Sequence, residues 1–308
     1  MTALLKPGAP LRVGTRASAL AVAQTSAIAA QLGTYELVTI TSEGDRSSAP
    51  LASMGGTGVF VSALRDALRA GEVDVIVHSF KDLPTAAAPG LVLAAVPPRE
   101  DPSDALCARD GHTLATLPKG AVVGTGSPRR AAQLLRHRPD LHVQAVRGNV
   151  DTRLRMVSDG SLDAVVLAAA GLRRLGRTAA ITESFGPDTM LPAPAQGALA
   201  VECRAEDFDT VWYSGLVRAV DCAQTRAAAT AERSMLATLE AGCIAPVGAA
   251  ASVTDGVLTL TGAVIAVDGS AIVAGELSGG SSAATDLGRE LALDLLSRGA
   301  AGLLGAAR

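Results

Sequence analysis

Residues 11–40, LRVGTRASALAVAQTSAIAAQLGTYELVTI, contain the unit from which the predicted fold is built. Residues 11–14 are predicted as a strand, and residues 18–32 as a helix, because Leu, Gln and Ile recur in the helical stretch at four-residue spacing. A second strand is predicted over residues 35–40. Strands that alternate with helices in this way are typical of an α/β domain with a parallel sheet.

The same alternation continues along the chain. Residues 73–79, VDVIVHS, form a largely β-branched run, which is typical of a strand buried on both faces. After a charged, proline-containing connector at residues 96–103, strands and helices alternate again between residues 121 and 169. The proline-rich stretch LPAPAQG at residues 191–197 is predicted to cross back to the first part of the chain. We therefore expect two α/β lobes.

The last part of the chain has a different pattern. A long helix is predicted over residues 224–241, short strands between residues 249 and 276, and a closing helix over residues 285–298. This order indicates a small α+β domain. With 308 residues, the chain is long enough for two or three domains. The predicted domains are residues 1–99 with 200–219, residues 100–199, and residues 220–308.

The composition argues against several classes of protein. The chain is 48% hydrophobic and 19% charged, which provides for a sizeable core. Four Phe, two Tyr and one Trp are few for a surface that stacks nucleic-acid bases. A net charge of −3 argues against a broad basic surface for DNA or for a membrane. Neither partner is expected.

Export, membrane insertion and metal binding are not expected either. The first residues, MTALLKPGAP, lack the long apolar segment of a signal peptide, and the longest apolar run, residues 164–172, is about half of the ~20 residues that a membrane span needs. The cytoplasm is the predicted location. No C-x-x-C pair occurs, so neither a zinc site nor a disulfide framework is predicted for the four cysteines, Cys107, Cys203, Cys222 and Cys243.

Two loops repeat one pattern. Residues 13–18 (VGTRAS) and 123–127 (VGTGS) both place Gly, Thr and Ser between a strand and the start of a helix. Helix N-termini carry free N–H groups and the positive end of the helix dipole, so two such loops facing a cleft would bind anions. A good turn and helix cap needs the same residues, and this simpler explanation stays open for either loop alone. Two matching loops favour a two-lobed binding cleft.

Arginines gather near the ends of the predicted strands. A guanidinium matches a carboxylate or a phosphate with two parallel hydrogen bonds, which a lysine does not. The sequence lacks G-x-G-x-x-G and G-x-x-x-x-G-K-[ST], so a ligand with several carboxylates fits as well as a phosphate. Solvated surface arginine is the alternative, and it is favoured for Arg136 and Arg138. The strand-end set consists of Arg16, Arg129, Arg130, Arg147, Arg153, Arg155, Arg173 and Arg174.

Arg129 and Arg130 are unusual within this set. They are expected in the first turn of a helix that begins after Ser127, with Pro128 as its first residue. Two cations at this position oppose the helix dipole, and the sequence shows no structural benefit that offsets the cost. A ligand with negative charge would explain them.

Two further motifs carry chemistry. Residues 78–82, HSFKD, lie at the end of a predicted parallel strand, where ligands are expected. Asp82 could act as a general acid–base or stabilise a cation, and Lys81 supplies positive charge. A surface Lys–Asp pair is the alternative, and His78 is expected to be a packed strand histidine. Cys243 lies in LEAGCIAPVG (239–248), a loop suited to a nucleophilic thiol or, more commonly, to a half-buried structural cysteine.

Taken together, these motifs resemble the hydroxymethylbilane synthase (porphobilinogen deaminase) family over nearly the whole chain. The resemblance rests on nine stretches in the family's order: RVGTRASALAVAQ (12–24), GGTGVF (55–60), VHSFKDLP (77–84), REDPSDAL (99–106), VGTGSPRRAAQL (123–134), RGNVDTRL (147–154), LAAAGLRRLG (167–176), PAPAQGALAVECR (192–204) and TAERSMLATLEAGCIAPVG (230–248).

The resemblance implies two lobes like those of periplasmic binding proteins and a third domain that carries Cys243. It implies a dipyrromethane cofactor joined to Cys243 by a thioether, and a transferase that adds four porphobilinogen units to it stepwise. Each unit loses ammonia, and water then releases the linear tetrapyrrole hydroxymethylbilane. Every pyrrole carries an acetate and a propionate, which would be the anions that the arginines bind.

The resemblance also implies roles for particular residues. Asp82 would assist the loss of ammonia and stabilise positively charged pyrroles. The residues that would bind the cofactor are Cys243, Lys81, Asp82, Ser127, Arg129, Arg130 and Arg147. Those that would bind substrate are Arg16, Ser18, Arg147, Arg153, Arg174 and Gln196.

Some positions depart from the family pattern. The usual Gly-Gly-Lys-Gly-Leu-Phe has Thr57 and Val59 here, which removes a lysine from a loop expected near the cleft. Phe80 and Ile244 stand where Met and Gln are common. The usual Pro-Ala-Val-Gly-Gln-Gly reads Pro194-Ala-Gln-Gly197 at its centre.

Two other functions are compatible with parts of the sequence. A non-catalytic two-lobed protein that binds a carboxylated small molecule would explain the loops and the arginines, but not Asp82 beside Lys81 or the domain with Cys243. A DNA-binding effector protein is less favoured, because no helix-turn-helix segment precedes the first lobe. A monomer is the family expectation, and the Gly- and Ser-rich loop Thr41–Gly56 is expected to be mobile.

Overall fold

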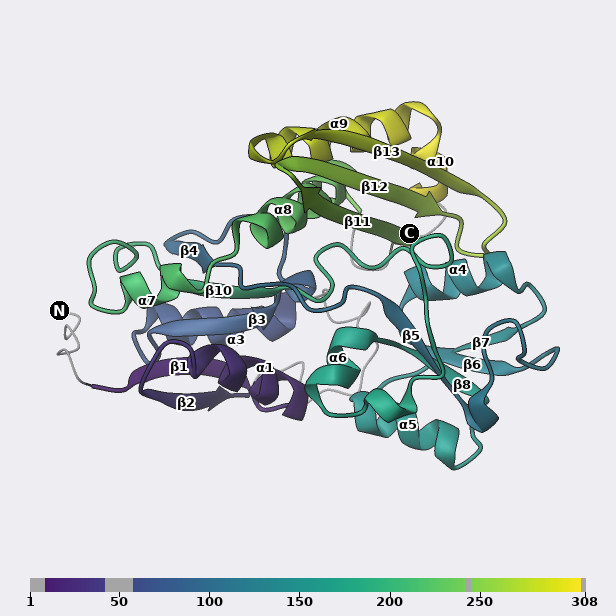
Figure 1. Cartoon of the computed structure of the whole chain (residues 1–308), viewed down its shortest axis with the longest axis horizontal. Coiled ribbons are helices and arrows are strands. Elements are labelled where there is room, and N and C mark those ends of the chain that lie inside the picture. The colour runs from purple at the N-terminus through teal and green to yellow at the C-terminus, as the bar shows by residue number, and fades with distance from the viewer. Residues whose placement is uncertain (1–8, 42–57, 242–244, 306–308) are drawn as a thin grey trace. The chain divides into compact units, whose positions relative to one another are not determined.

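The computed structural model describes residues 9–41, 58–241 and 245–305 (Figure 1). The chain divides into two compact units, one made of residues 1–99 and 198–226 and the other of residues 100–197 and 227–308. Each unit is described by itself. Of the sequence predictions, those on Cys243, Thr57 and most of the Thr41–Gly56 loop lie outside the described residues.

The first unit is built on a five-stranded sheet. Its strands, in the spatial order β2-β1-β3-β10-β4, are β1 (Leu11–Arg16), β2 (Tyr35–Ile40), β3 (Val75–Ser79), β4 (Leu91–Ala95) and β10 (Leu199–Arg204). β1 runs parallel to β2 and β3, whereas β10 runs antiparallel to both of its neighbours. Helices α1 (Ala19–Ala29) and α7 (Ser214–Ala219) cover one face, and α3 (Gly58–Arg69) packs on the other.

The second unit contains a sheet of the same design. Its order is β7-β6-β8-β5-β9, from β5 (Asp104–Ala108), β6 (Val122–Thr125), β7 (His142–Ala145), β8 (Ala164–Ala168) and β9 (Glu183–Ser184). Again three strands are parallel and the fourth, β5, is antiparallel to its neighbours. Helix α4 (Pro128–His137) covers one face, and α5 (Val150–Ser158) and α6 (Ala169–Arg174) cover the other, as Figure 1 shows.

The repeated loop pattern therefore reflects two sheets of one topology. Residues 13–18 lie between β1 and α1, and residues 123–127 lie between the equivalent β6 and α4. Glycine is needed in each loop for the same reason, which is the lack of space for a Cβ. A Cβ on Gly14 would lie 2.8 Å from Ile76 Cγ2, and one on Gly124 would lie 2.6 Å from Leu162 Cδ1, so neither strand tolerates a side chain there.

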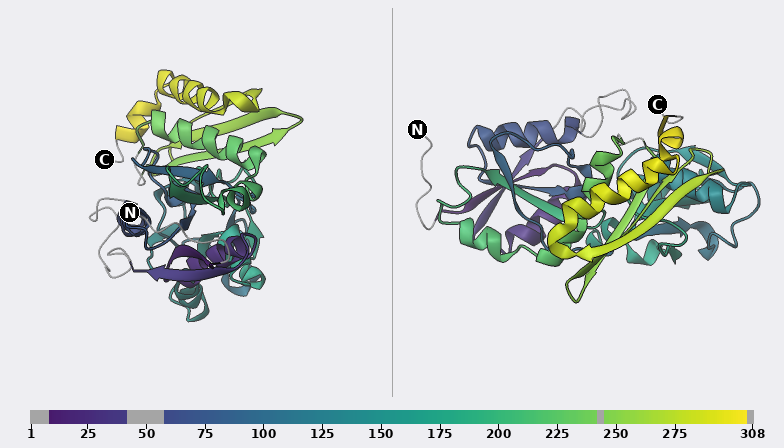
Figure 2. Two further views of the ribbon diagram at one scale, coloured as in Figure 1. Left: turned by 90° about the vertical axis from the view of Figure 1, so that its left-hand side faces the viewer. Right: turned by 90° about the horizontal axis from the view of Figure 1, so that it is seen from above.

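A third sheet belongs to the second unit. It consists of β11 (Val247–Thr254), β12 (Val257–Ile265) and β13 (Ile272–Gly280), paired antiparallel in that order. Helices α8 (Ala223–Thr238), α9 (Ala284–Ser297) and α10 (Ala300–Gly305) pack on one face of it. In Figure 2, α8 and α9 lie side by side, and they touch closely at Gly288, where a Cβ would lie 2.2 Å from Ala231 O. The chain thus has two α/β lobes and a small C-terminal α+β domain, as predicted.

The predicted parallel strands are present in both lobes, and each sheet is mixed because β10 and β5 run antiparallel to the strands beside them. β10 and β5 enter their sheets from connecting segments and not through a helical crossover, so they are free to run antiparallel to the strands beside them. All six residues of β10 are buried. Short 3₁₀ helices complete the fold at Phe80–Asp82, Arg109–Gly111, Thr178–Ala180 and Ser281–Ala283.

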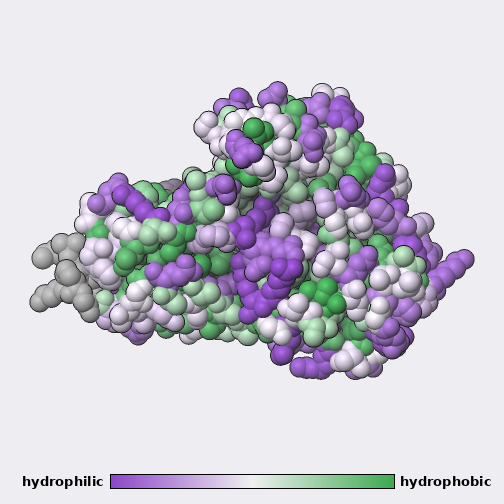
Figure 3. Space-filling view, viewed as in Figure 1, coloured by the Kyte–Doolittle hydropathy of each residue, from purple (hydrophilic) through white to green (hydrophobic). Residues whose placement is uncertain are grey.

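In the part of the chain that the structure describes, the exposed large hydrophobic residues do not gather on one helix or strand. Hydrophilic and hydrophobic residues are mixed over the face shown in Figure 3. The exposed large hydrophobic residues among those described, Leu216, Val257, Val267 and Leu293, lie on different elements. Over residues 9–41, 58–241 and 245–305, no helix has the length and apolar character to cross a bilayer.

Candidate active site

The first unit has a pocket at the carboxyl ends of β1 and β3. Arg16 ends β1, Ser18 caps α1, and Asp82 ends the 3₁₀ turn that follows β3. All three are half-buried and line one cavity of about 80 Å³. The geometry brings together three of the predicted site residues. The full lining is Arg16, Ser18, Leu20, Ala21, Gln24, Val61, Val77, His78, Ser79 and Asp82.

Local hydrogen bonds hold the walls of this pocket. The Ser18 hydroxyl accepts a bond from the Ala21 N–H at 3.3 Å and so begins α1 as the sequence predicts. The Ser79 hydroxyl donates to Gln24 Oε1 at 3.0 Å, which joins the end of β3 to α1. These bonds hold the start of α1 and the end of β3, which both line the pocket.

His78 is a packed strand histidine, as predicted, although it also borders the pocket. It is 7% exposed, and its Nε2 lies 3.3 Å from Oε2 of Glu202 on β10. Arg65 of α3 binds the same carboxylate with two hydrogen bonds of 3.0 and 2.7 Å. Burial opposes ionisation of Glu202, but the hydrogen bonds from His78 and Arg65 outweigh it and lower its pKa to about 2.

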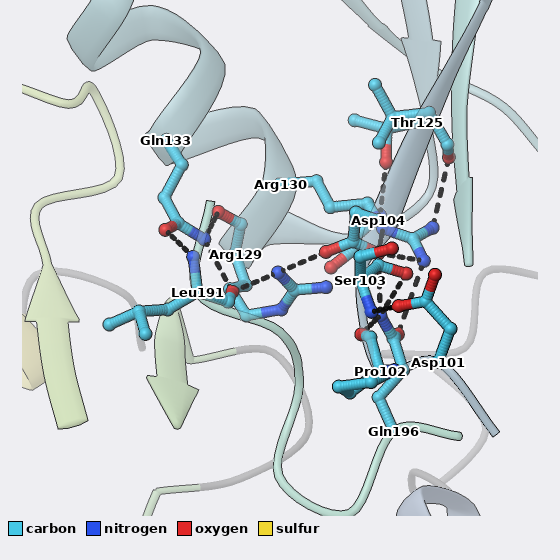
Figure 4. Close-up of polar contacts among 12 residues, drawn as sticks. Asp101, Pro102, Ser103, Asp104, Thr125, Arg129, Arg130, Gln133, Leu191 and Gln196 are labelled. Atoms are coloured by element: carbon cyan, nitrogen blue, oxygen red, sulfur yellow. Dashed lines mark hydrogen bonds and ion pairs between the residues drawn. The ribbon is translucent and has the colours of Figure 1, made fainter. Parts of the chain in front are cut away.

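The second unit gathers arginines around one buried carboxylate. Asp104, the first residue of β5, is 0% exposed, and Arg129 and Arg130 from the first turn of α4 are 4% and 6% exposed (Figure 4). Arg129 Nη1 lies 2.7 Å from Asp104 Oδ2, and Arg130 Nη2 lies 2.7 Å from Oδ1. This ion cluster is the structural benefit that the sequence alone does not reveal.

Arg153 lies near the positive charges of Arg130 and Arg147, and no carboxylate among the described residues forms an ion pair with it. Burial lowers its pKa, and the positive charges of Arg130 and Arg147 lower it further. Its Nε is buried without a hydrogen bond. Gly126, in the loop before α4, lies close to it, since a Cβ there would be 3.7 Å from Arg153 Nη2. A half-buried guanidinium in this state fits an anionic ligand.

The remaining predicted residues of this unit differ in their surroundings. Arg147 is exposed, and Arg174 is half-buried with its Nη2 donating to Gly197 O at 2.8 Å. Ser127 occupies the cap position of α4, but its side chain makes no capping hydrogen bond. Gln196 is 0% exposed, and its Nε2 donates to Asp104 Oδ1 and to Pro102 O, both at 2.8 Å. Gln196 therefore supports the ion cluster from inside.

The described cysteines have very different reactivity. Cys107 in β5 and Cys203 in β10 are buried, and burial raises their pKa values to about 12 and about 11. Cys222 is half-buried, and hydrogen bonds from Thr225 lower its pKa. Among the residues that the structure describes, no three His, Cys, Asp or Glu side chains are placed to share a metal ion.

Comparison with known proteins decides the family. A family model described as "Porphobilinogen deaminase, dipyromethane cofactor binding domain" matches residues 11–211. A second, "Porphobilinogen deaminase, C-terminal domain", matches residues 226–297. The chain belongs to the porphobilinogen deaminase family.

Individual relatives agree with this assignment. A porphobilinogen deaminase of Leifsonia xyli subsp. xyli is 56% identical and the match covers 95% of this chain and 94% of the relative. One from Mycobacterium tuberculosis is 52% identical, with 96% of this chain and 98% of the relative covered. The function of this chain is porphobilinogen deaminase (hydroxymethylbilane synthase) activity, a transferase reaction of tetrapyrrole synthesis. The enzyme uses a dipyrromethane cofactor, and porphobilinogen is its substrate. The non-catalytic binding protein is not favoured.

Solved structures are more distant. A putative methionine-binding lipoprotein of Bacillus subtilis is 14% identical with a TM-score of 0.41, over 68% of this chain and 89% of that one. The periplasmic aliphatic sulphonate binding protein of Escherichia coli is 13% identical with a TM-score of 0.38, over 75% and 70%. Likeness at this level adds nothing to the assignment of the family.

Sequence reasoning missed the residue at the centre of the ion cluster. Asp104 was included in the stretch REDPSDAL, but no function was assigned to it. The available signal was the pair of adjacent arginines at a helix N-terminus, which requires a nearby negative charge. Which carboxylate supplies that charge depends on how β5 lies beside β8, and this pairing is not readable from local sequence.

Proposed function

We propose that Asp82 is the catalytic group of this deaminase and that Cys243 carries its dipyrromethane cofactor. The observation that supports the role of Asp82 is its position in one pocket with Arg16 and Ser18, at the carboxyl ends of two parallel strands. Arg16 and Ser18 would bind substrate carboxylates there. Lys81, the neighbour of Asp82 in the sequence, would bind the cofactor.

The chemistry assigned to Asp82 follows from its charge. Loss of ammonia from porphobilinogen leaves a positively charged, electron-poor pyrrole, which a fixed carboxylate stabilises. The same carboxylate can hold or return a proton at the departing amine. His78 does not serve this purpose in the proposal, because its Nε2 faces Glu202.

The arginines of the second unit fit a cofactor that bears carboxylates. The buried, unpartnered Nε of Arg153, beside the charges of Arg130 and Arg147, is the observation that supports this fit. When bound, the cofactor supplies the end to which porphobilinogen is added. Ser127, Arg129, Arg130 and Arg147 would hold the cofactor, and Arg147, Arg153 and Arg174 would hold substrate. Gln196, which is buried and donates to Asp104, would help to hold these arginines in place.

The assignment of the cofactor to Cys243 has support from the other cysteines. Attachment through a thioether requires a thiolate nucleophile. Raised pKa values disfavour Cys107 and Cys203. Cys222 is the competing thiol, because its pKa is lowered. Only Cys243 lies in the stretch that resembles the family's cofactor loop. We further propose that the protein acts in the cytoplasm as a monomer.

The test of the catalytic group is Asp82→Asn. The amide keeps the shape and removes the charge and the proton-transfer capacity, so turnover measured as ammonia release should fall by about 10²–10⁴-fold. Asp66→Asn is the matched control: Asp66 belongs to the same unit, and its side chain is 72% exposed, so activity should stay within about twofold. Ammonia release near the wild-type rate in Asp82→Asn would exclude Asp82 as the catalytic group.

A further inference from the structure

We infer that Asp104 is a positioning residue of the cofactor-binding site and acts through Arg129 and Arg130. Asp104 is 0% exposed, so it does not touch a ligand itself. The inference rests on the proposed role of the two arginines in holding cofactor carboxylates. It adds the group that fixes where those arginines lie.

Three side chains contact the Asp104 carboxylate. Oδ2 contacts Arg129 Nη1 at 2.7 Å, and Oδ1 contacts Arg130 Nη2 at 2.7 Å and Nε at 2.8 Å. Gln196 Nε2 makes the fourth contact with the carboxylate, to Oδ1 at 2.8 Å. Figure 4 shows these side chains converging from α4 and from the segment before β10. One carboxylate thus ties together three side chains from two separate segments.

The charge of Asp104 is what allows the arginines to stay buried. Both lie in the first turn of α4, where the helix dipole is positive. Burial lowers the pKa of Arg129, and its neighbour Arg130 lowers it further, while Asp104 raises it. Two adjacent cations without a carboxylate would not both remain inside, and at least one would turn to water.

Asp104 keeps this charge throughout the working pH range. Burial opposes its ionisation, but the charges of Arg129 and Arg130 and the hydrogen bonds from Arg129 and Gln196 outweigh burial and hold its pKa well below the usual range. Asp104 is therefore ionised at neutral pH, where it can pair with both arginines.

Backbone carbonyl groups also hold the two arginines. Arg129 Nη1 donates to Leu191 O at 2.5 Å, and Arg130 Nη1 donates to Val166 O of β8 at 3.0 Å. Their guanidinium planes are consequently fixed before a ligand binds. Fixed charges of this kind lower the cost of binding a carboxylate, since no side chain has to be ordered at that moment.

The test is cofactor assembly in Asp104→Asn. Full-length protein prepared without porphobilinogen is titrated with it, and intact mass reports the fraction of folded chains that gain two pyrrole units. The amide keeps the size of the side chain, removes the charge and turns N–H groups toward cations. The porphobilinogen concentration that loads half of the folded chains should rise tenfold or more.

Asp140→Asn is the matched control. Asp140 binds Arg138 in the same lobe with two contacts of 2.7 Å, and it lies outside the cluster. This variant should lose stability without a change in the loading midpoint. A midpoint in Asp104→Asn that equals the wild-type value, or lies below it, overturns the inference, because a purely structural role reduces the folded fraction and leaves the loading of folded chains unchanged.

Two further variants complete the test. Asp104→Glu restores the charge one bond further out, and its midpoint should lie between those of wild type and Asp104→Asn. If Asp104→Asn does not fold, an unchanged midpoint in Asp104→Glu overturns the inference.

Arg129→Leu separates the two proposals. Normal loading of this variant contradicts the proposed role of the arginines, whereas impaired loading in Arg129→Leu with normal loading in Asp104→Asn contradicts only the role of Asp104.

Discussion

Arg136 and Arg138 lie two residues apart at the end of α4, and they differ in exposure and in their contacts with the described residues. The side chain of Arg138 is 20% exposed. It binds Asp140 with two contacts of 2.7 Å and donates to Leu114 O at 2.6 Å and Leu117 O at 3.0 Å. The prediction that both are solvated surface arginines is therefore wrong for Arg138. Long-range backbone acceptors of this kind leave no local trace in sequence.

This difference gives a stability prediction. Arg138→Leu leaves the Asp140 carboxylate and two carbonyl groups without their donor, so the free energy of unfolding should fall by roughly 1–3 kcal/mol. Arg136→Leu should change it by about 0.5 kcal/mol or less, because Arg136 is exposed. Urea unfolding of the two variants measures both. Equal stability of the two would mean that the contacts of Arg138 contribute nothing.

Ala195 shows how a departure from the family pattern is accommodated. It stands where the usual Pro-Ala-Val-Gly-Gln-Gly has its first glycine, and its φ is +61°, a region that L residues rarely adopt. Its N–H donates to Oε2 of the buried Glu232 at 2.5 Å, and Oε1 of Glu232 accepts from Ala251 N–H at 2.7 Å. The surrounding contacts impose the conformation. The sequence shows the substitution but not the strain.

At the scale of elements, β3, β10 and α3 are joined by one buried carboxylate. Glu202 of β10 binds Arg65 of α3 and His78 of β3. Its folded-state pKa of about 2 lies below the ordinary value of 4.5, so the unfolded chain binds the proton more tightly. The resulting stability is fully present above about pH 4.5 and is lost as the pH falls toward 2.

The prediction is a pH-dependent effect of Glu202→Gln. The stability difference between wild type and this variant should shrink by roughly 2 kcal/mol between pH 6 and pH 3, since a shift of one pKa unit corresponds to about 1.4 kcal/mol. Urea unfolding at the two pH values measures it, with the exposed Glu206→Gln as control. A difference between wild type and Glu202→Gln that stays constant over this range contradicts the assigned role of the carboxylate.

The elements also show what local sequence can predict. The helices α1, α4, α5 and α9 and the parallel strands lie close to their expected positions, because each has its own apolar period or β-branched run. The antiparallel strands β4, β5 and β10 follow connectors, and their place in a sheet is set by pairing with strands far away in the sequence. The same limit applies to the site residues. Sequence motifs indicate Asp82, Arg129 and Cys243, whereas no motif indicates Asp104.

At the scale of the whole molecule, the proposed function assigns roles to residues that are far apart in sequence. Asp82 belongs to the first unit, and Arg129 and Arg130 belong to the second. The two five-stranded sheets share one topology, so the loops at residues 13–18 and 123–127 occupy equivalent positions in their sheets. The C-terminal sheet packs on α4 through Ala263 and Ile265 against Ala132, which places it in the same unit as the arginine cluster.

The most direct test of the account is to locate the cofactor on the chain. Intact mass of the denatured protein, followed by peptide mapping, should show an addition of two pyrrole units on the peptide that contains Cys243. The addition should persist in Cys107→Ser, Cys203→Ser and Cys222→Ser, and Cys243→Ser should lose it together with most activity. An addition that maps to Cys222, the described thiol whose pKa is lowered, would contradict the account.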